Sequence, residues 1–297
     1  MSSCNIFKSV VIIGANGCIG QFLTNIISPV AEKLHLIDPS YTTHSDNKSS
    51  CDLINCENTI KNNLLSESTL IIIATSFAVF SRLTDSILKF IPDDCLLIDT
   101  TSVKLETLNH YNKILTASNR NLEILSIDPL FKPDASLSKK PIAYFSLNAS
   151  SQTKSFIALL EKSNCQPFIS TAEEHDQALS IVQTATHAVT LLLGDTIAHS
   201  NINYDTLQKY ATPPFKILLL VLRRIVEGTP EVYWDIQANN VYADNIRTQL
   251  LDNLNKLSRL SSKEKLGEFS EMIKNIEEAT KSKEKPKSTL LEIAELL

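Results

Sequence analysis

Residues 10–23 read VVIIGANGCIGQFL, a short apolar run that leads directly into three glycines. Gly14, Gly17 and Gly20 are half of the six glycines in the chain. Glycine makes up about 7% of an average protein, so this chain holds about a third of the usual share. A chain this poor in glycine clusters it only where the backbone geometry demands it. The stretch therefore predicts a strand, a tight glycine turn and a helix.

This order is typical of a turn that binds the phosphates of a dinucleotide. Gly14 permits the tight turn, Gly17 lets the backbone approach a pyrophosphate, and Gly20 lets the helix lie close to the strand. The start of the helix adds free N–H groups and a partial positive charge. The cofactor contacts that we expect from this turn are Gly14, Asn16, Gly17, Cys18, Ile19 and Gly20.

An acidic residue supports the assignment. Asp38 follows the next predicted strand, Leu34–Ile37, and lies 18 residues after Gly20. A carboxylate there accepts hydrogen bonds from ribose hydroxyls and repels a 2′-phosphate, which favours NAD over NADP. Short-chain dehydrogenases share this glycine spacing but carry a catalytic Tyr-x-x-x-Lys, and no tyrosine of this chain has a lysine four residues on.

The rest of the first half alternates between strands and helices, which predicts a Rossmann-type, doubly wound α/β domain over residues 1–170. The predicted strands are apolar at consecutive positions, as in parallel sheets buried on both faces. Two of the helices are expected at Gln21–Ile27 and Phe80–Phe90. The predicted strands are Val10–Ile13, Leu34–Ile37, Leu70–Ala74, Cys95–Asp99, Ile124–Ile127, Ile142–Leu147 and, more weakly, Pro167–Ser170.

The second half shows no convincing strand, so residues 171–297 are expected to form an all-α dimerisation domain. The segment Phe215–Ile225 is apolar nearly all round and must be buried. We expect a second copy of the chain to cover it, giving a homodimer through the C-terminal helices. Residues 281–297 are basic and then apolar, which suits either a disordered tail or one that docks. The predicted helices are Glu173–Ala198, Pro214–Val226, Pro230–Leu257 and Lys263–Thr280.

Composition excludes several classes of protein. The chain has 297 residues and a net charge of −5, which argues against nucleic acid as the main partner. Its most apolar run, Leu70–Ser81, is too short to span a membrane. The six cysteines form no Cys-x-x-Cys pair, which favours reduced thiols in the cytoplasm. We expect no metal site.

Five stretches together resemble the prephenate dehydrogenase family, over about four-fifths of the chain. Each stretch is modest alone, but their order and spacing are specific. The stretches are Gly14–Gly20, Asp99–Lys104, Asp128–Asp134, Glu174–Asp176 with His187 twelve residues after His175, and Thr212–Tyr233.

The resemblance implies an NAD-dependent oxidoreductase of tyrosine biosynthesis, with its active site between a dinucleotide-binding domain and a helical domain. The family's reaction is an oxidative decarboxylation of prephenate, or of the related arogenate. Hydride leaves C4 of a cyclohexadiene for the nicotinamide, the ring carboxylate leaves as CO₂, and the ring becomes aromatic as 4-hydroxyphenylpyruvate.

By motif, the resemblance also assigns residues around the substrate. Arg224 matches an arginine that holds a substrate carboxylate, and Lys216 stands where many relatives carry another arginine. His187 matches a histidine near the substrate, and Ser102 a serine near the reacting hydroxyl and the nicotinamide. The stretch Glu174–Asp176 opens a predicted helix, where acidic residues also cap helices.

One departure touches the chemistry. The family's general base is a histidine in a stretch like His-Pro-Met-Phe-Gly-Pro-Asp, whereas this chain has Asp128 at the histidine and Lys132 at the glycine. Three explanations stay open. Asp128 is itself the base for prephenate; or it pairs with the ammonium group of 4-amino-4-deoxyprephenate, giving 4-aminophenylpyruvate for specialised metabolism; or the chain is an inactive NAD-binding homologue.

Overall fold

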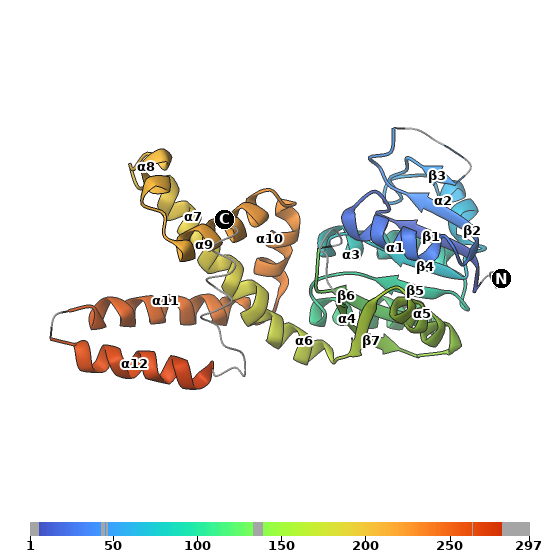
Figure 1. The fold of residues 1–297 in the computed structure, drawn as a ribbon. Helices are drawn as coiled ribbons and strands as arrows, with labels where there is room; N and C mark the ends of the chain where they lie inside the picture. The colour runs from blue at the N-terminus through green and yellow to red at the C-terminus, as the bar shows by residue number, and fades with distance from the viewer. Residues whose placement is uncertain (1–5, 43–44, 46, 133–138, 263, 281–297) are drawn as a thin grey trace. The chain divides into compact units, whose positions relative to one another are not determined.

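The computed structural model describes residues 6–42, 45, 47–132, 139–262 and 264–280 (Figure 1). The chain forms two compact units, Met1–Ala178 and Leu179–Leu297. The division falls a little after the domain boundary predicted at residue 170, because the first turns of helix α6 (Ala172–Leu179) bond to the first unit. The predicted tail over 281–297 lies outside the described residues.

The first unit is built on one eight-stranded sheet with the order β3-β2-β1-β4-β5-β6-β7-β8. Strand order reverses between β1 and β4, as expected of a doubly wound sheet, and this switch point is where such sheets bind ligands. The strands are β1 (Phe7–Ile13), β2 (Ala31–Ile37), β3 (Lys48–Ser49), β4 (Leu70–Ile73), β5 (Leu96–Asp99), β6 (Glu123–Pro129), β7 (Lys140–Leu147) and β8 (Cys165–Ile169).

The sheet is not parallel throughout. The predicted strand Ile142–Leu147 is confirmed as β7, but β7 runs antiparallel to β6, and β8 runs parallel to β7. The physical reason is the short connection from Pro129 to Lys140, which leaves no room for the crossover helix that a parallel neighbour needs. The edge strand β3 was not predicted, because it is only two residues long.

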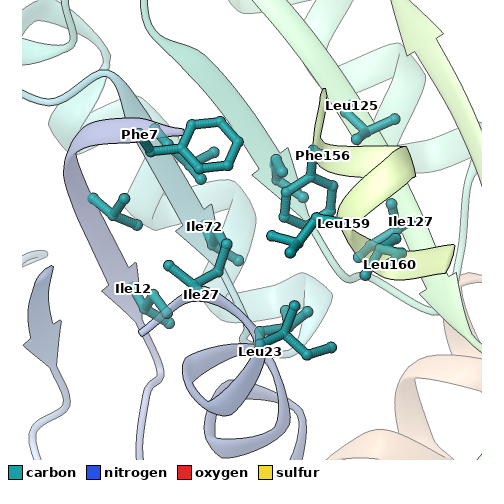
Figure 2. Packing of buried hydrophobic residues seen from close by; sticks show 14 of the residues in the cluster. Phe7, Ile12, Leu23, Ile27, Ile72, Leu125, Ile127, Phe156, Leu159 and Leu160 are labelled. Atoms are coloured by element: carbon teal, nitrogen blue, oxygen red, sulfur yellow. The ribbon is translucent and has the colours of Figure 1, made fainter. Parts of the chain in front are cut away.

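Alternate residues of the central strands enter two separate cores, one on each face of the sheet. Helices α1 (Cys18–Ile27) and α5 (Ser151–Lys162) cover one face, where Leu23 and Phe156 are fully buried (Figure 2). Helices α2 (Asn58–Leu65), α3 (Phe77–Ile87) and α4 (Leu105–Ser118) cover the other. A short 3₁₀ turn, Leu88–Phe90, follows α3. Burial on both faces explains why the strands read as continuous apolar runs.

The second unit is helical throughout its described residues. The predicted helix Glu173–Ala198 contains a π-helical segment, Ser180–Ala185, between α6 and α7 (Thr186–Ala198). The predicted helix Pro230–Leu257 is two helices, because the chain turns at Asn240, whose side chain accepts a hydrogen bond from the Tyr242 N–H. The remaining helices are α8 (Tyr204–Lys209), α9 (Pro213–Val226), α10 (Pro230–Asn239), α11 (Ala243–Leu260) and α12 (Leu266–Ala279).

Helix α9 carries the apolar segment for which a partner was predicted. It buries Leu219 and Ile225 within its own chain, but Leu218 and Leu220 are 44% and 47% exposed. None of the helices built from the described residues has the length and apolar character needed to span a bilayer. All five cysteines in the described ranges are free thiols.

Candidate active site

The glycine turn is as tightly constrained as the sequence predicts. Gly14 has a positive φ of 79°, and a Cβ there would lie 2.3 Å from the carbonyl oxygen of Ala74, which directly follows the neighbouring strand β4. A Cβ on Gly20 would lie 2.1 Å from the carbonyl oxygen of Gly14. Gly17 differs, because its Cβ would meet nothing closer than 3.4 Å. The fold itself therefore requires Gly14 and Gly20, while the space around Gly17 is open.

Asp38 and the turn are brought together at the carboxyl ends of β1 and β2. The Asp38 carboxylate accepts hydrogen bonds from the Asn16 N–H at 3.1 Å and from the Ser40 N–H and hydroxyl at 2.9 and 2.6 Å. Cys18 is exposed and Ile19 half-buried at the start of α1. A carboxylate beside an open glycine turn fits the phosphates and ribose of a dinucleotide.

The difference among the glycines gives a direct test. Gly17→Ala should weaken NAD binding by about tenfold or more, because a methyl group takes the space a phosphate needs, which corresponds to about 1.4 kcal/mol. The thermal midpoint of the free protein should change little, since the added Cβ makes ordinary contacts. Calorimetric titration with NAD measures the first effect, and thermal unfolding without NAD measures the second. A fall in the thermal midpoint as large as that caused by Gly14→Ala would contradict this assignment.

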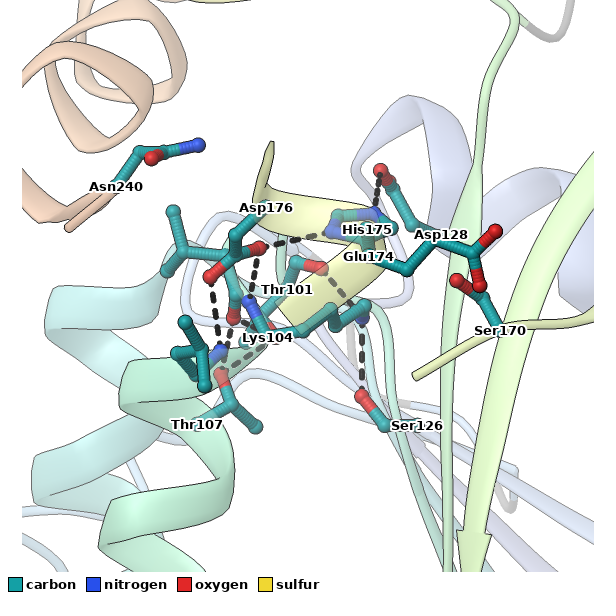
Figure 3. Close-up of polar contacts among 12 residues, drawn as sticks. Thr101, Lys104, Thr107, Ser126, Asp128, Ser170, Glu174, His175, Asp176 and Asn240 are labelled. Carbon is teal, nitrogen blue, oxygen red and sulfur yellow. Dashed lines mark hydrogen bonds and ion pairs between the residues drawn. The ribbon is translucent and has the colours of Figure 1, made fainter. Parts of the chain in front are cut away.

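Asp128 lies near the carboxyl end of β6 and is only 4% exposed. Its Oδ2 is 3.0 Å from Nε2 of His175, and Nδ1 of His175 is 2.8 Å from Oδ1 of Asp176 (Figure 3). The imidazole thus stands between two carboxylates. Among the described residues, Asp128 makes no other side-chain hydrogen bond, so Oδ1 is left for a ligand.

Asp176 has a second task. Its two carboxylate oxygens accept hydrogen bonds from the N–H groups of Lys104 and Leu105, both at 2.9 Å. These N–H groups start helix α4, so Asp176 caps a helix other than its own. Thr171 caps the start of α6, because its hydroxyl accepts a hydrogen bond from the Glu174 N–H at 3.0 Å.

The environment of His175 favours its protonated form. Burial by itself would lower the pKa of His175, but the hydrogen bonds to Asp128 and Asp176 and the Asp128 charge outweigh it and raise the pKa above its usual value. The Lys104 ammonium opposes this in part. Because both ring nitrogens face carboxylates, only the imidazolium can donate to both.

Lys104 ties the carboxyl ends of β5 and β6 together. Its ammonium donates to the carbonyls of Thr101 and Ile127 at 2.6 and 2.8 Å and to the Ser126 hydroxyl at 2.9 Å. It also pairs with Asp99 at 3.6 Å, both groups being fully buried. Ser102 lies half-buried in the loop between β5 and α4, at the same edge of the sheet as Asp128.

The second unit holds the other predicted substrate residues. The rings of His187 and Tyr233 meet edge to face with centroids 5.0 Å apart, and the Tyr233 hydroxyl donates to the Arg224 carbonyl at 3.1 Å. Burial, and then the Arg224 cation, lower the pKa of His187, which favours a neutral imidazole. Lys216 is half-buried on α9, two turns before Arg224.

Unpaired polar atoms gather around the π-helical segment. Among the described residues, Gln183 Oε1, Thr184 Oγ1 and His187 Nδ1 are buried and have no hydrogen-bond partner. Buried polar atoms are rarely left unpaired, and π-helical segments often mark functional sites. Three such atoms within five residues indicate a place for a polar ligand.

A cavity of about 810 Å³ lies elsewhere, along the outer side of α1. Cys18 and Lys132 line it, together with Phe22 and Lys140. Asp128 and Asp38 do not belong to its lining, so we do not assign it to substrate or cofactor. Dinucleotides bind at the carboxyl ends of the strands, where the glycine turn and Asp38 meet.

The predicted site residues therefore form two groups. Asp128, Ser102 and the cofactor turn belong to the first unit, while His187, Lys216 and Arg224 belong to the second. Their convergence on one substrate stays a prediction. His175 was not predicted as a site residue, although a histidine between two acids after an apolar strand was the signal for it.

The chain is similar to several known proteins. Residues 171–275 match the family model described as "Prephenate dehydrogenase, dimerization domain". A 4-amino-4-deoxyprephenate dehydrogenase from Streptomyces pristinaespiralis is 30% identical over 155 residues, covering 52% of this chain and 51% of that protein. A T-protein from Enterobacter agglomerans is 24% identical over 234 residues, covering 78% and 57%. The chain thus spans about half the length of the curated relatives it matches.

The fold is shared with solved structures. A prephenate dehydrogenase from Aquifex aeolicus, solved with hydroxyphenyl propionate and NAD⁺, superposes with a TM-score of 0.68 at 19% identity, covering 91% of this chain and 98% of that one. The chain shares this fold, a Rossmann-type sheet followed by a helical unit. The family match covers residues 171–275, the helical part of the chain.

Proposed function

We propose that the protein catalyses the NAD-dependent oxidative decarboxylation of prephenate, or of a closely related cyclohexadienyl acid, in tyrosine biosynthesis. The observation that carries this proposal is the buried Asp128–His175 pair at the same sheet edge as Ser102. A site that oxidises an alcohol carbon needs a proton acceptor at the carboxyl ends of the strands, and Asp128 is placed there.

Each residue has a separate task in this reaction. Asp128 accepts the proton of the C4 hydroxyl at Oδ1, and Ser102 orients that hydroxyl by a hydrogen bond. The glycine turn and Asp38 hold the cofactor. Bound there, NAD would supply the hydride acceptor for C4. The C1–carboxylate bond breaks, CO₂ leaves, and the bonding electrons complete the aromatic ring. The proton held by Asp128 then returns to the ring oxygen, which gives the phenol. Because the ring becomes aromatic, a weak base is sufficient.

The helical unit supplies the groups for the substrate's negative charge. Arg224 binds a carboxylate through its planar guanidinium, and Lys216 adds a second cation on the same helix. Neutral His187 donates or accepts one hydrogen bond to the substrate. The unpaired polar atoms of Gln183 and Thr184 support a polar ligand beside His187.

Arg224→Lys tests the carboxylate role. Lysine keeps the charge but cannot form two parallel hydrogen bonds, so KM for the cyclohexadienyl acid should rise by about tenfold or more. The KM for NAD should stay constant, because Arg224 lies in the unit without the glycine turn. Initial rates with each substrate varied in turn give both constants. The neighbouring Arg223→Lys, also on α9 and exposed, is the matched control. Equal KM values for the cyclohexadienyl acid in the two variants would contradict the assignment.

A second substrate is favoured by a specific observation. Asp128, to which we assign the proton-accepting role, is a carboxylate, and a carboxylate pairs with an ammonium group better than a neutral imidazole does. The 30% identical relative from Streptomyces pristinaespiralis is a 4-amino-4-deoxyprephenate dehydrogenase. With that substrate the protein makes 4-aminophenylpyruvate, and Asp128 acts as a specificity residue.

One assay separates these functions. NADH formation is followed with the full chain and prephenate, arogenate or 4-amino-4-deoxyprephenate, each with NAD and with NADP. Turnover of prephenate or arogenate with NAD supports the first proposal, and turnover of the amino compound alone supports the second. Absence of turnover in the presence of measurable NAD binding would leave an inactive NAD-binding homologue.

We also propose a homodimer in the cytoplasm, formed through the helical unit. The exposed leucines of α9 and the match of residues 171–275 to a dimerization domain support it. Light scattering should give twice the 33.0 kDa mass of one chain. Leu218→Glu together with Leu220→Glu should return that mass to the single-chain value.

A further inference from the structure

We propose that His175 is a positioning residue that acts as an imidazolium, holding Asp128 as an ionised carboxylate with one oxygen free for the substrate. This inference rests on the proposed function, because it gives Asp128 its task in the reaction. It concerns a residue that does not itself touch the substrate, and it accounts for how a carboxylate works at this position.

The neighbours of the two ring nitrogens determine where His175 carries its protons. Asp176 accepts two backbone N–H groups at the start of α4, so both of its oxygens act as hydrogen-bond acceptors. Nδ1 of His175 lies 2.8 Å from Asp176 and must carry a proton, since a bare nitrogen there would face a negative charge. Nε2 lies 3.0 Å from Oδ2 of Asp128 and donates to it by the same reasoning.

The charges around the pair then balance. The N–H groups and the positive end of α4 offset the charge of Asp176. The His175 imidazolium offsets the charge of Asp128, so the ionised carboxylate presents little net charge to an anionic substrate. Lys104 is neutralised by Asp99, and Glu174 is exposed. A carboxylate beside a substrate with two carboxylates would otherwise repel it, and this arrangement reduces that repulsion.

The pair also determines the pH dependence. His175 must keep its Nε2 proton to hold Asp128, which sets an alkaline limb of kcat/KM. Loss of that proton leaves a nitrogen lone pair facing the carboxylate at 3.0 Å, so activity falls as the pH rises.

His175→Gln separates this proposal from a purely structural role. Glutamine donates a neutral hydrogen bond at every pH but carries no charge. The alkaline limb should therefore disappear, and kcat/KM should fall by about tenfold or more at neutral pH, as expected for losing a hydrogen bond between charged groups. His175→Ala should lose more activity than His175→Gln.

His110→Gln is the matched control, because His110 is a half-buried histidine of the same unit, bonded to Thr84 at 2.6 Å and away from the site. It should leave the pH profile unchanged. A His175→Gln profile with the alkaline limb in its original place would overturn the proposal for His175 while the proposed function stands.

A measurement that needs no turnover completes the test. ¹⁵N NMR of the histidines in the full chain should show both ring nitrogens of His175 protonated at neutral pH, and Asp128→Asn should lower the pKa of His175. A neutral His175 in the unaltered protein would overturn the proposal. If no cyclohexadienyl acid is turned over, the proposed function fails, and this spectrum still reports whether the charged pair exists.

Discussion

Asp128→Asn should lower kcat by about 10²- to 10⁴-fold, the usual contribution of a positioned proton acceptor. Asparagine has almost the same shape as aspartate but cannot accept the C4 proton or pair with an ammonium group. The glycine turn and Asp38 are untouched, so the affinity for NAD should be unchanged. Steady-state rates give kcat, and calorimetric titration gives the NAD affinity.

The same variant also distinguishes the two candidate substrates. With prephenate, loss of the base lowers kcat more than it raises KM, because the carboxylate acts in the transition state. With the amino substrate, KM should rise as well, because Asp128 also binds the ammonium group. Asp85→Asn, an exposed carboxylate on α3, is the control and should leave both constants unchanged. An Asp128→Asn enzyme with unaltered kcat would show that another group accepts the proton.

Local patterns predicted the central sheet well. Strands buried on both faces leave continuous apolar runs, such as Leu70–Ile73, and a glycine cluster follows the first of them. Helices α2 and α4 were not predicted, because polar residues interrupt their apolar positions. The direction of β7 depends on the length of the connection before it, which an apolar pattern does not report.

The geometry of the glycine turn was predictable because its residues are close in sequence, and Gly14 and Gly20 each have a backbone reason to be there. The Asp128–His175 pair was not, since its two members are 47 residues apart. A His between two acids at a helix start reads as capping, and only the folded chain shows that Asp176 caps α4 instead. The π-helical segment was missed because the regular apolar spacing continues through it.

The buried cation beside the site makes the largest prediction for stability. Lys104→Met should lower the free energy of unfolding by about 3–5 kcal/mol. This is the cost of removing one partner of a buried ion pair while the charge of the other stays buried. Lys104 and Asp99 are 1% and 0% exposed, so water cannot replace the lost ammonium. Urea unfolding at neutral pH measures the difference.

Lys61→Met is the matched control. Lys61 is also buried, at 5% exposed, but its ammonium bonds only the Ile54 carbonyl and the Ser86 hydroxyl among the described residues. Its loss leaves no carboxylate uncompensated, so the cost should be clearly smaller. Adding Asp99→Leu to Lys104→Met should recover part of the stability, because the remaining charge is removed with its partner. Equal destabilisation by the two lysine variants would mean that Lys104 contributes through packing and hydrogen bonds rather than through the Asp99 charge.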